Sequence, residues 1–500
     1  MNDAFNISDA VFAAADRQPH AIALIDGRQV LDRRSLCAGI LQAAMQFRRA
    51  GWRAGDVVGI SLRAGGSMHL LVSLALARSG ITQIAMPADD PEAMLRARAA
   101  AVGLRAMVCD HPRAAASGVE TFAADPAWLT VDGGVAGCED LRQAGGDRLW
   151  IIGASSGTTG APKLIGISHR LEEAHGRRQS PVFGYRAGER FLNLTGLNYL
   201  TGIKRAVRCL SEGGTPVFLP GNVDAAGLFE WIDRYNVRYL SCAPVHLQQM
   251  LTDGSGDGLR LPFLRVLRST GSVLPPATLA AVCRRITPNV YVDYGLNEVS
   301  TIVAATPAML AESAQTVGRP LAGVELQVVD AADQPLPAGV TGYVRARGPG
   351  IEPAYLATQT PESQRLFRDG WCYTGDMASM DAGGLLFIKG RADEAMNHEG
   401  TLIWPGEIEA VLRAHPAVLD AAAFALSSDV HQDVPVAAVV CADSAPPDDL
   451  PRHCEQRLGA RAPRLFMRVA VIPRNATGKI LRGELVRLAQ RRLQGGGGKS

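Results

Sequence analysis

The chain carries at residues 155–163 the stretch Ser155-Ser156-Gly157-Thr158-Thr159-Gly160-Ala161-Pro162-Lys163. It follows the apolar run Leu149-Trp150-Ile151-Ile152, which predicts a buried strand. Glycines let a backbone turn its N–H groups toward an anion, hydroxyls add donors, and a lysine adds a mobile positive charge. The stretch therefore predicts a phosphate-binding loop, for which an ordinary Ser/Gly turn is the simpler alternative.

Lysine is rare in this chain, which makes Lys163 conspicuous. There are 51 basic residues and only five lysines, so arginine supplies the other 46; the lysines are Lys163, Lys204, Lys389, Lys479 and Lys499. A second Gly-Lys pair stands in Thr477-Gly478-Lys479. These two contexts favour a functional use of the lysine charge.

The composition indicates an ordinary globular enzyme with two or three domains, because the 500 residues are 47% hydrophobic and 20% charged. A net charge of +2 gives no reason to expect a nucleic acid partner. No apolar run is long enough for a membrane span, and the first residues do not resemble a secretion signal. Nine scattered cysteines without a CxxC pair predict reduced thiols in the cytoplasm.

Strand-like and helix-like segments alternate along most of the chain, as in the strand-like Val57–Leu62 and the helix-like His69–Ala77. From about Val317 short β-like segments replace them, and beyond Arg391 a small α+β unit follows. We therefore expect an α/β protein. Its large N-terminal domain, residues 1–392, should hold mixed sheets covered by helices plus a β-rich subdomain. A small mobile α+β domain, residues 393–500, should follow and end in a flexible Gly-rich tail.

Five separated motifs occur in this order: Ser155–Lys163, Tyr294-Gly295-Leu296-Asn297-Glu298, Tyr373-Thr374-Gly375-Asp376, Gly390-Arg391-Ala392-Asp393-Glu394, and Pro473-Arg474-Asn475-Ala476-Thr477-Gly478-Lys479-Ile480. They resemble, in order and spacing, the signatures of the adenylate-forming ligases. That superfamily contains acyl-CoA synthetases, adenylation domains of peptide synthetases, and luciferase. The resemblance covers essentially the whole chain.

The resemblance implies a two-step reaction. ATP and a carboxylate give an acyl-adenylate and pyrophosphate, and the acyl group then passes to a thiol. ATP and Mg²⁺ are the implied cofactors, with CoA or a phosphopantetheinyl carrier protein as acceptor. A carboxylate is a poor nucleophile and is repelled by triphosphate, so such a site must supply positive charge.

The resemblance also implies roles for single residues. Lys479 would bridge the carboxylate and the α-phosphate, and Asn297 would donate to the α-phosphate. Glu298 would bind Mg²⁺, which prefers one or two carboxylates plus phosphate oxygens. The residues that it places around the nucleotide are Ser155, Ser156, Gly157, Thr158, Thr159, Gly160, Lys163, Gly271, Ser272, Asp293, Tyr294, Gly295, Asp376, Arg391 and Lys479.

Four positions depart from the family pattern. Asn297 replaces a threonine, Leu164 a glycine, Asn397 a common lysine, and Tyr343 a usual glutamate. The charged signature residues remain in place, so we expect a working enzyme. A non-catalytic nucleotide-binding homologue is the alternative. A P-loop phosphotransferase is excluded, because residues 153–164 do not fit GxxxxGK(S/T).

The second half-reaction implies a moving domain. Asp393 resembles the hinge about which the C-terminal domain rotates, and Gly400 resembles the glycine that lets a pantetheine arm pass close to the backbone. One orientation would deliver Lys479 for adenylation, and the other would withdraw it for thiol transfer.

The acyl group should lie against Leu194–Gly202. The residues expected to contact it are Leu197, Asn198, Tyr199, Gly202, Thr270 and Gly295. A neutral Asn198 pairs poorly with a buried ammonium, which disfavours amino acids. The Asn-Tyr pair resembles a segment of aryl-acid-activating enzymes and favours an aryl or hydroxy-aryl acid, with a short or medium fatty acid as the alternative. The sequence leaves open whether CoA or a carrier protein accepts the acyl group.

Overall fold

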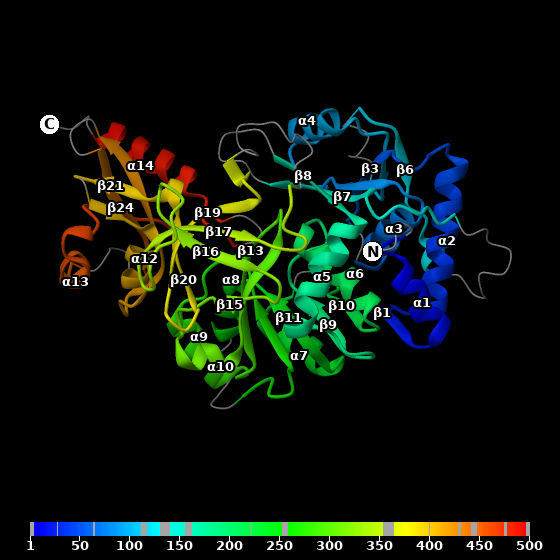
Figure 1. The fold of residues 1–500 in the computed structure, drawn as a ribbon, viewed down its shortest axis with the longest axis horizontal. Helices are drawn as coiled ribbons and strands as arrows, with labels where there is room; N and C mark the ends of the chain where they lie inside the picture. Colours follow the sequence, from blue (N-terminus) through cyan, green and yellow to red (C-terminus); the bar gives the residue numbers. More distant parts are fainter. Residues whose placement is uncertain are drawn as a thin grey trace.

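The chain is described by a computed structural model that covers residues 5–27, 29–63, 66–111, 118–130, 141–155, 163–221, 223–252, 259–353, 365–399, 401–428, 432–441, 448–474 and 478–496. Figure 1 shows a large body, coloured blue to yellow, beside a smaller orange and red unit that carries the C-terminal end. Sheets and helices alternate in the large body, so the mixed α/β class predicted from the sequence is confirmed.

The largest sheet has nine strands in the order β15-β14-β13-β12-β11-β9-β10-β1-β2. Six consecutive strands of this order pair in parallel, namely β13, β12, β11, β9, β10 and β1. Their bounds are β1 (Ile22–Asp26), β2 (Gln29–Asp32), β9 (Arg190–Asn193), β10 (Thr215–Phe218), β11 (Val237–Cys242), β12 (Val266–Ser269), β13 (Val290–Leu296), β14 (Ser300–Ala305) and β15 (Arg319–Pro320). The carboxyl ends of six parallel strands thus lie at one edge, where α/β sheets bind ligands.

Helices cover both faces of this sheet. Alternate residues of a strand point to opposite faces, and Leu192 joins one hydrophobic core while its neighbour Phe191 joins another. On the Leu192 face pack α7 (Ala225–Arg234), α8 (Pro244–Thr252) and α9 (Pro276–Arg285), and α10 (Pro307–Glu312) lies beside β13 and β14. On the opposite face lie α5 (His169–Phe183) and α6 (Leu200–Ser211).

A second sheet of six strands has the order β6-β5-β3-β4-β7-β8. Its strands are β3 (Val57–Ser61), β4 (Thr82–Ala85), β5 (Ala106–Cys109), β6 (Thr121–Ala123), β7 (Leu149–Ser155) and β8 (Lys163–Ser168). The accompanying helices are α1 (Asp9–Arg17), α2 (Arg33–Arg49), α3 (Gly66–Arg78), α4 (Glu92–Val102) and the short η2 (Pro126–Leu129). Every residue of α3 after Gly66 is buried, because the helix packs against strands of both sheets.

The predicted β-rich subdomain is an antiparallel sheet of five strands. These are β16 (Glu325–Val329), β17 (Gly342–Arg347), β18 (Phe367–Arg368), β19 (Trp371–Met380) and β20 (Leu386–Arg391). The isolated bridge from Gly318 to Leu386 ties it to the start of β15 in the nine-stranded sheet. The hydrogen bond between Tyr294 and Asp376 joins β13 to β19.

The C-terminal unit has its own sheet and two cores of its own. Its elements are η3 (Ala392–Glu394), β21 (Met396–His398), β22 (Thr401–Ile403), α12 (Pro405–Arg413), β23 (Val418–Ser428), β24 (Gln432–Cys441), α13 (Leu450–Leu458), η4 (Gly459–Arg461), β25 (Leu465–Arg468) and α14 (Arg482–Gly496). Residues of β23 alternate between the cores: Ala421 and Ala423 face α12 and α13, while Ala422 and Phe424 face α14. The segment that contains Asp393 joins this unit to β20.

Among the helices of the described residues, none combines the length and the hydropathy that a membrane crossing requires.

Candidate functional site

The predicted phosphate-binding loop joins β7 to β8. The two strands are antiparallel, and Ser155 at the end of β7 is the register partner of Lys163 at the start of β8. The residues between them, 156–162, lie outside the described residues; they include Ser156, Gly157, Thr158, Thr159 and Gly160. The described strands therefore bring Ser155 and Lys163, the two ends of this segment, opposite each other.

Three residues predicted to bind the nucleotide lie close together: Tyr294 of β13, Asp376 of β19 and Arg391 of β20. The Tyr294 hydroxyl donates to Asp376 Oδ2 at 2.6 Å, and Arg391 Nη1 lies 3.8 Å from Asp376 Oδ1. Burial raises the pKa of Asp376, although the Tyr294 hydrogen bond and the charges of Arg391 and Lys479 act in the opposite direction. The site thus holds one carboxylate, 14% exposed, that accepts from a hydroxyl and lies near the Arg391 guanidinium.

Arg391 is fixed by three contacts. It donates from Nη1 to the Thr374 carbonyl at 2.9 Å and from Nε to Asp393 Oδ1 at 3.1 Å, and it faces Asp376. Burial opposes its charge, but the hydrogen bond to Asp393 and the two aspartate charges outweigh that effect and raise its pKa. Gly375 has a φ of 74°, and a Cβ there would lie 3.0 Å from the Arg391 guanidinium. A glycine is therefore required beside this arginine.

The side chain of Asp293 lies deeper than the sequence analysis expected. Its Oδ2 accepts from Arg268 at 2.7 Å, from Thr301 at 2.7 Å and from Arg205 at 3.2 Å. Burial would raise the pKa of Asp293, but the two guanidinium charges outweigh burial and lower it to about 2. Through Oδ2 the carboxylate, 5% exposed, links β12, β13 and α6, while its Oδ1 is buried without a hydrogen-bond partner among the described residues.

Asn297 and Glu298 lie in the turn between β13 and β14. Asn297 is exposed, whereas Glu298 is 8% exposed. A Cβ on Gly295 would lie 2.0 Å from the Ser300 carbonyl oxygen, so this hairpin requires a glycine there. No cluster of three metal-binding side chains occurs within the described ranges. A Mg²⁺ ion held by Glu298 would thus take its other ligands from phosphate and water, which is its usual preference.

The segment after β12 contains Thr270, Gly271 and Ser272, three of the residues predicted to lie near the substrates. Thr270 Oγ1 accepts a hydrogen bond from Arg205 Nη2 at 3.3 Å. Gly271 has a φ of 92°, and Ser272 is exposed. The conformation at Gly271 is one that a side chain would strain, which explains the glycine.

A cavity of about 500 Å³ opens at the carboxyl ends of β9, β10 and β1. Leu197 and Asn198 line it, and the Asn198 side-chain oxygen is buried without a partner among the described residues. Tyr199 lies at the N-cap of α6 and is 38% exposed. A Cβ on Gly202 would lie 2.2 Å from the Gly196 carbonyl oxygen, so the glycine lets α6 approach this segment closely.

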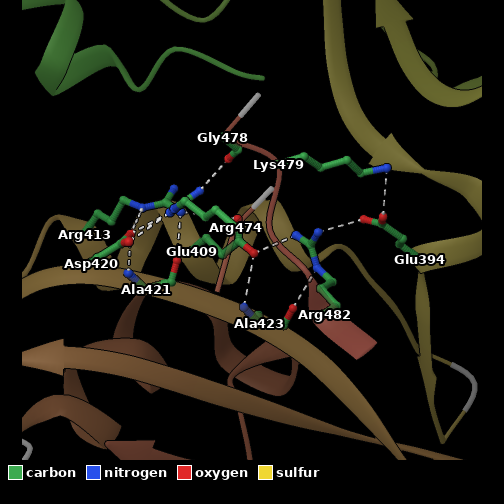
Figure 2. Close-up of polar contacts among 10 residues, drawn as sticks. All are labelled: Glu394, Glu409, Arg413, Asp420, Ala421, Ala423, Arg474, Gly478, Lys479 and Arg482. Carbon is green, nitrogen blue, oxygen red and sulfur yellow. Dashed lines mark hydrogen bonds and ion pairs between the residues drawn. The ribbon is translucent and has the colours of Figure 1, made fainter. Parts of the chain in front are cut away.

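Lys479 comes from the C-terminal unit and faces the large body. Figure 2 shows its side chain extended toward Glu394, with the Nζ–Oε1 distance at 3.9 Å. A Cβ on the preceding Gly478 would lie 3.2 Å from a Val245 methyl group, so the lysine segment rests against the start of α8. The hinge candidate Asp393 has a side chain 61% exposed, and Gly400 lies outside the described residues.

Sequence reasoning missed the arginines that support the site. Arg205 in α6 and Arg268 in β12 are buried around Asp293, and neither belongs to a motif. Both arginines stand next to apolar residues, Arg205 before Ala206-Val207 and Arg268 after Val266-Leu267, and a buried charge requires a partner.

Comparisons with known proteins identify two matching family models and several related ligases. The family described as AMP-binding enzyme matches residues 11–356, and the family described as AMP-binding enzyme C-terminal domain matches residues 407–479. The 2-succinylbenzoate–CoA ligase of Geobacillus kaustophilus is 27% identical over 94% of this chain and 95% of its own length. The sulfoacetate–CoA ligase of Cupriavidus necator is 29% identical over 66% of this chain and 65% of its own length. The 4-coumarate–CoA ligase 3 of Oryza sativa is 26% identical over 89% of this chain and 84% of its own length.

Solved structures share the fold. The o-succinylbenzoate CoA synthetase of Bacillus subtilis, in complex with an acyl-adenylate intermediate, superposes with a TM-score of 0.85. It is 22% identical, and the match covers 95% of this chain and 97% of that one.

Proposed function

Because the chain belongs to the AMP-binding enzyme family, we propose that it activates an aryl carboxylic acid with ATP and passes the acyl group to CoA. The general activity is that of an AMP-forming acid–thiol ligase. The observation that carries our assignment of residues is the convergence of Tyr294, Asp376, Arg391 and Lys479 from two sheets and the C-terminal unit.

The nucleotide would lie at the carboxyl ends of β12 and β13. Asp376 would accept hydrogen bonds from the ribose diol, while Arg391 would offset its charge and hold its orientation. Tyr294 would offer its ring to the adenine. The backbone N–H groups of the loop after Ser155 would hold the β- and γ-phosphates together with Lys163.

The charge distribution explains how an acid could attack a triphosphate. The carboxylate and the α-phosphate repel each other, and Lys479 would lie between them to stabilise the negative charge that grows as the bond forms. Magnesium at Glu298 would supply further positive charge to the phosphates when it is bound. Asn297, exposed beside Glu298, would donate to the α-phosphate.

The acid is assigned from the cavity beside Leu197 and Asn198. Its volume of about 500 Å³ lies within the usual range for ligand pockets. The unpartnered Asn198 oxygen can accept a hydrogen bond from a ring hydroxyl. Ligases for 2-succinylbenzoate, indoleacetate and 4-coumarate are among the relatives, and each of these acids contains an aromatic ring.

We favour CoA over a carrier protein because these relatives are CoA ligases. Transfer would require the C-terminal unit to turn about Asp393, so that the segment around Gly400 replaces Lys479 at the site. Eight cysteines in the described ranges are free thiols, which supports the reducing cytoplasm as the compartment.

The test is ATP–pyrophosphate exchange over a panel of hydroxy-aryl, aryl, short-chain and medium-chain acids, followed by CoA thioester formation with the acids that respond. We expect exchange that requires Mg²⁺ and is greatest with hydroxy-aryl acids. Greatest exchange with an aliphatic acid would replace the aryl assignment. No exchange with any acid, using folded protein, would contradict catalysis itself.

A further inference from the structure

Lys479 lies in a closed hairpin of the C-terminal unit. Arg474 and Ile480 form an antiparallel bridge, and the Leu481 N–H donates to the Pro473 carbonyl at 2.9 Å. The lysine immediately precedes the bridge, so its backbone is held while its side chain extends toward the large body (Figure 2). Movement of the ammonium therefore depends on the side chain and its neighbours.

An arginine anchors each end of this hairpin to the C-terminal sheet. Arg474 makes two hydrogen bonds to Asp420, both at 2.9 Å, and one to the Gly478 carbonyl at 3.0 Å. Arg482 donates to the Ala423 carbonyl at 3.0 Å and to Glu409 Oε1 at 2.7 Å. The hairpin thus moves as one body with the sheet.

Glu394 adds a contact of a different kind, because it follows the hinge candidate Asp393 directly in the chain. Its Oε2 lies 3.0 Å from Arg482 Nη1, and its Oε1 lies 3.9 Å from Lys479 Nζ. Figure 2 shows the carboxylate between the two cations. Arg482 therefore fixes the carboxylate, and the carboxylate attracts the lysine.

The ion pairs of this network differ in length. Carboxylate oxygens lie 2.9 Å from Arg474 and within 3.0 Å of Arg482, whereas the Lys479–Glu394 distance is 3.9 Å and the lysine side chain is 49% exposed. The Lys479 charge also acts to lower the pKa of Asp376 and of Asp393, so Glu394 is one of several carboxylates near the ammonium. The contact with Glu394 is therefore a weaker constraint on the ammonium than the arginine pairs are on their guanidinium groups.

We propose that Glu394 is a positioning residue for Lys479, one that holds the ammonium at the hinge side of the site until the acid and ATP are bound. The inference rests on the proposed function, because it takes Lys479 as the group that assists adenylation. A lysine side chain has four flexible bonds, and restricting them before the reaction removes an entropic cost from the chemical step. At 3.9 Å the contact is longer than a hydrogen bond, so it holds the ammonium weakly enough for bound anions to draw it away.

The predicted effect is selective and modest. Glu394→Gln keeps the size of the side chain and removes its charge. We expect the kcat of ATP–pyrophosphate exchange to fall about fivefold, which corresponds to the ~1 kcal/mol upper value for a partly exposed ion pair. The KM for ATP and the transfer of the acyl group from supplied acyl-adenylate to CoA should each change less than about twofold, because neither uses the position of the lysine.

Glu407 offers a matched control in the same domain. Its side chain is 28% exposed and lies 3.3 Å from Arg461, whereas that of Glu394 is 26% exposed and lies 3.0 Å from Arg482. Glu407→Gln should leave both half-reactions unchanged. Glu394→Asp, which keeps the charge, should recover part of the lost exchange. Equal losses in both half-reactions, an equal loss in the Glu407 variant, or unchanged exchange in Glu394→Gln would overturn the proposal.

A double substitution separates this inference from the proposed function. Lys479→Ala should lower exchange about 10²–10³-fold, the usual effect of removing such a group. In that background Glu394→Gln should change the residual exchange less than about twofold, because it acts through the lysine. A further fivefold loss there would show that Glu394 acts by another route. Absence of exchange in the unmodified enzyme would instead overturn the proposed function and this inference with it.

Discussion

At the scale of the residue, Tyr294 shows what a motif predicts and what it leaves out. Its place in the motif predicts an aromatic face for adenine, whereas its hydroxyl bond to Asp376 joins residues 82 positions apart. The contact between Arg205 and Asp293 spans 88 positions. Such contacts depend on strand order, which local periodicity does not contain. The motifs could therefore give the identities of site residues but not the network that supports them.

Tyr294→Phe should change the pH dependence of ATP use. The hydroxyl stabilises the ionised form of Asp376 and lowers its pKa, so its loss should raise that pKa. If the ionised carboxylate binds ribose, the acid limb of kcat/KM for ATP should move to higher pH. The pH profile of exchange measures this, with the exposed Tyr343→Phe as control. An acid limb at an unchanged pH would contradict a role for the ionised Asp376 carboxylate in ATP binding.

Asn198→Ala should change the choice of acid. The amide oxygen is buried and has no hydrogen-bond partner among the described residues, so a substrate hydroxyl could donate a hydrogen bond to it. A buried hydroxyl left without a partner costs ~1–3 kcal/mol. The preference for a hydroxylated acid over its deoxy analogue should then fall about 5- to 150-fold, with the apparent ATP affinity nearly unchanged. Relative kcat/KM values for paired acids check this, and unaltered ratios would favour the aliphatic alternative.

At the scale of the element, α3 and α5 carry three buried histidines. The apolar run from His69 to Ala77 predicts a helix, and α3 confirms it. The sequence could not predict that α3 lies between two sheets. A helix with apolar residues on all sides is expected to be buried, but this pattern does not indicate which elements pack against it. Burial lowers the pKa of His69, His169 and His175 from 6.5 to about 4.

These histidines should make the protein sensitive to mild acid. The unfolded chain takes up protons near pH 6.5, whereas the folded chain resists them down to about pH 4. The stabilisation is therefore complete above pH 6.5 and is lost as the pH falls from there toward 4. Urea unfolding at several pH values should show a falling free energy of unfolding across this window. His69→Gln should reduce the slope and the exposed His20→Gln should not; equal slopes in both variants would contradict the assignment.

At the scale of the whole molecule, the sequence predicts two parts joined near Asp393, and that boundary stays a prediction. Two hydrophobic cores lie entirely within residues 396–489, which is what an independent movement of that part would require. The sequence could not predict which orientation this structure would have. That depends on contacts such as Gly478 against Val245, which form between distant segments.

Asp393→Pro should separate the two half-reactions. Proline fixes φ near about −65°, and a hinge has to change its backbone angles. Exchange should continue, because Lys479 already faces the large body, while CoA thioester formation should be lost. Single-turnover measurements of each step test this, with Glu407→Gln in α12 as a control. Full overall turnover in the proline variant would remove Asp393 from the hinge role.

The position of the lysine hairpin also has a consequence for how the protein is made. Lys479 follows all other residues that we place in the site, and ribosomes build a chain from its N-terminus. Domains fold in that order during synthesis, so a nascent chain can complete the nucleotide-binding part before the hairpin exists. A growing polypeptide could then hold ATP without being able to activate an acid, and catalytic competence would begin only when translation of the C-terminal unit has passed this hairpin.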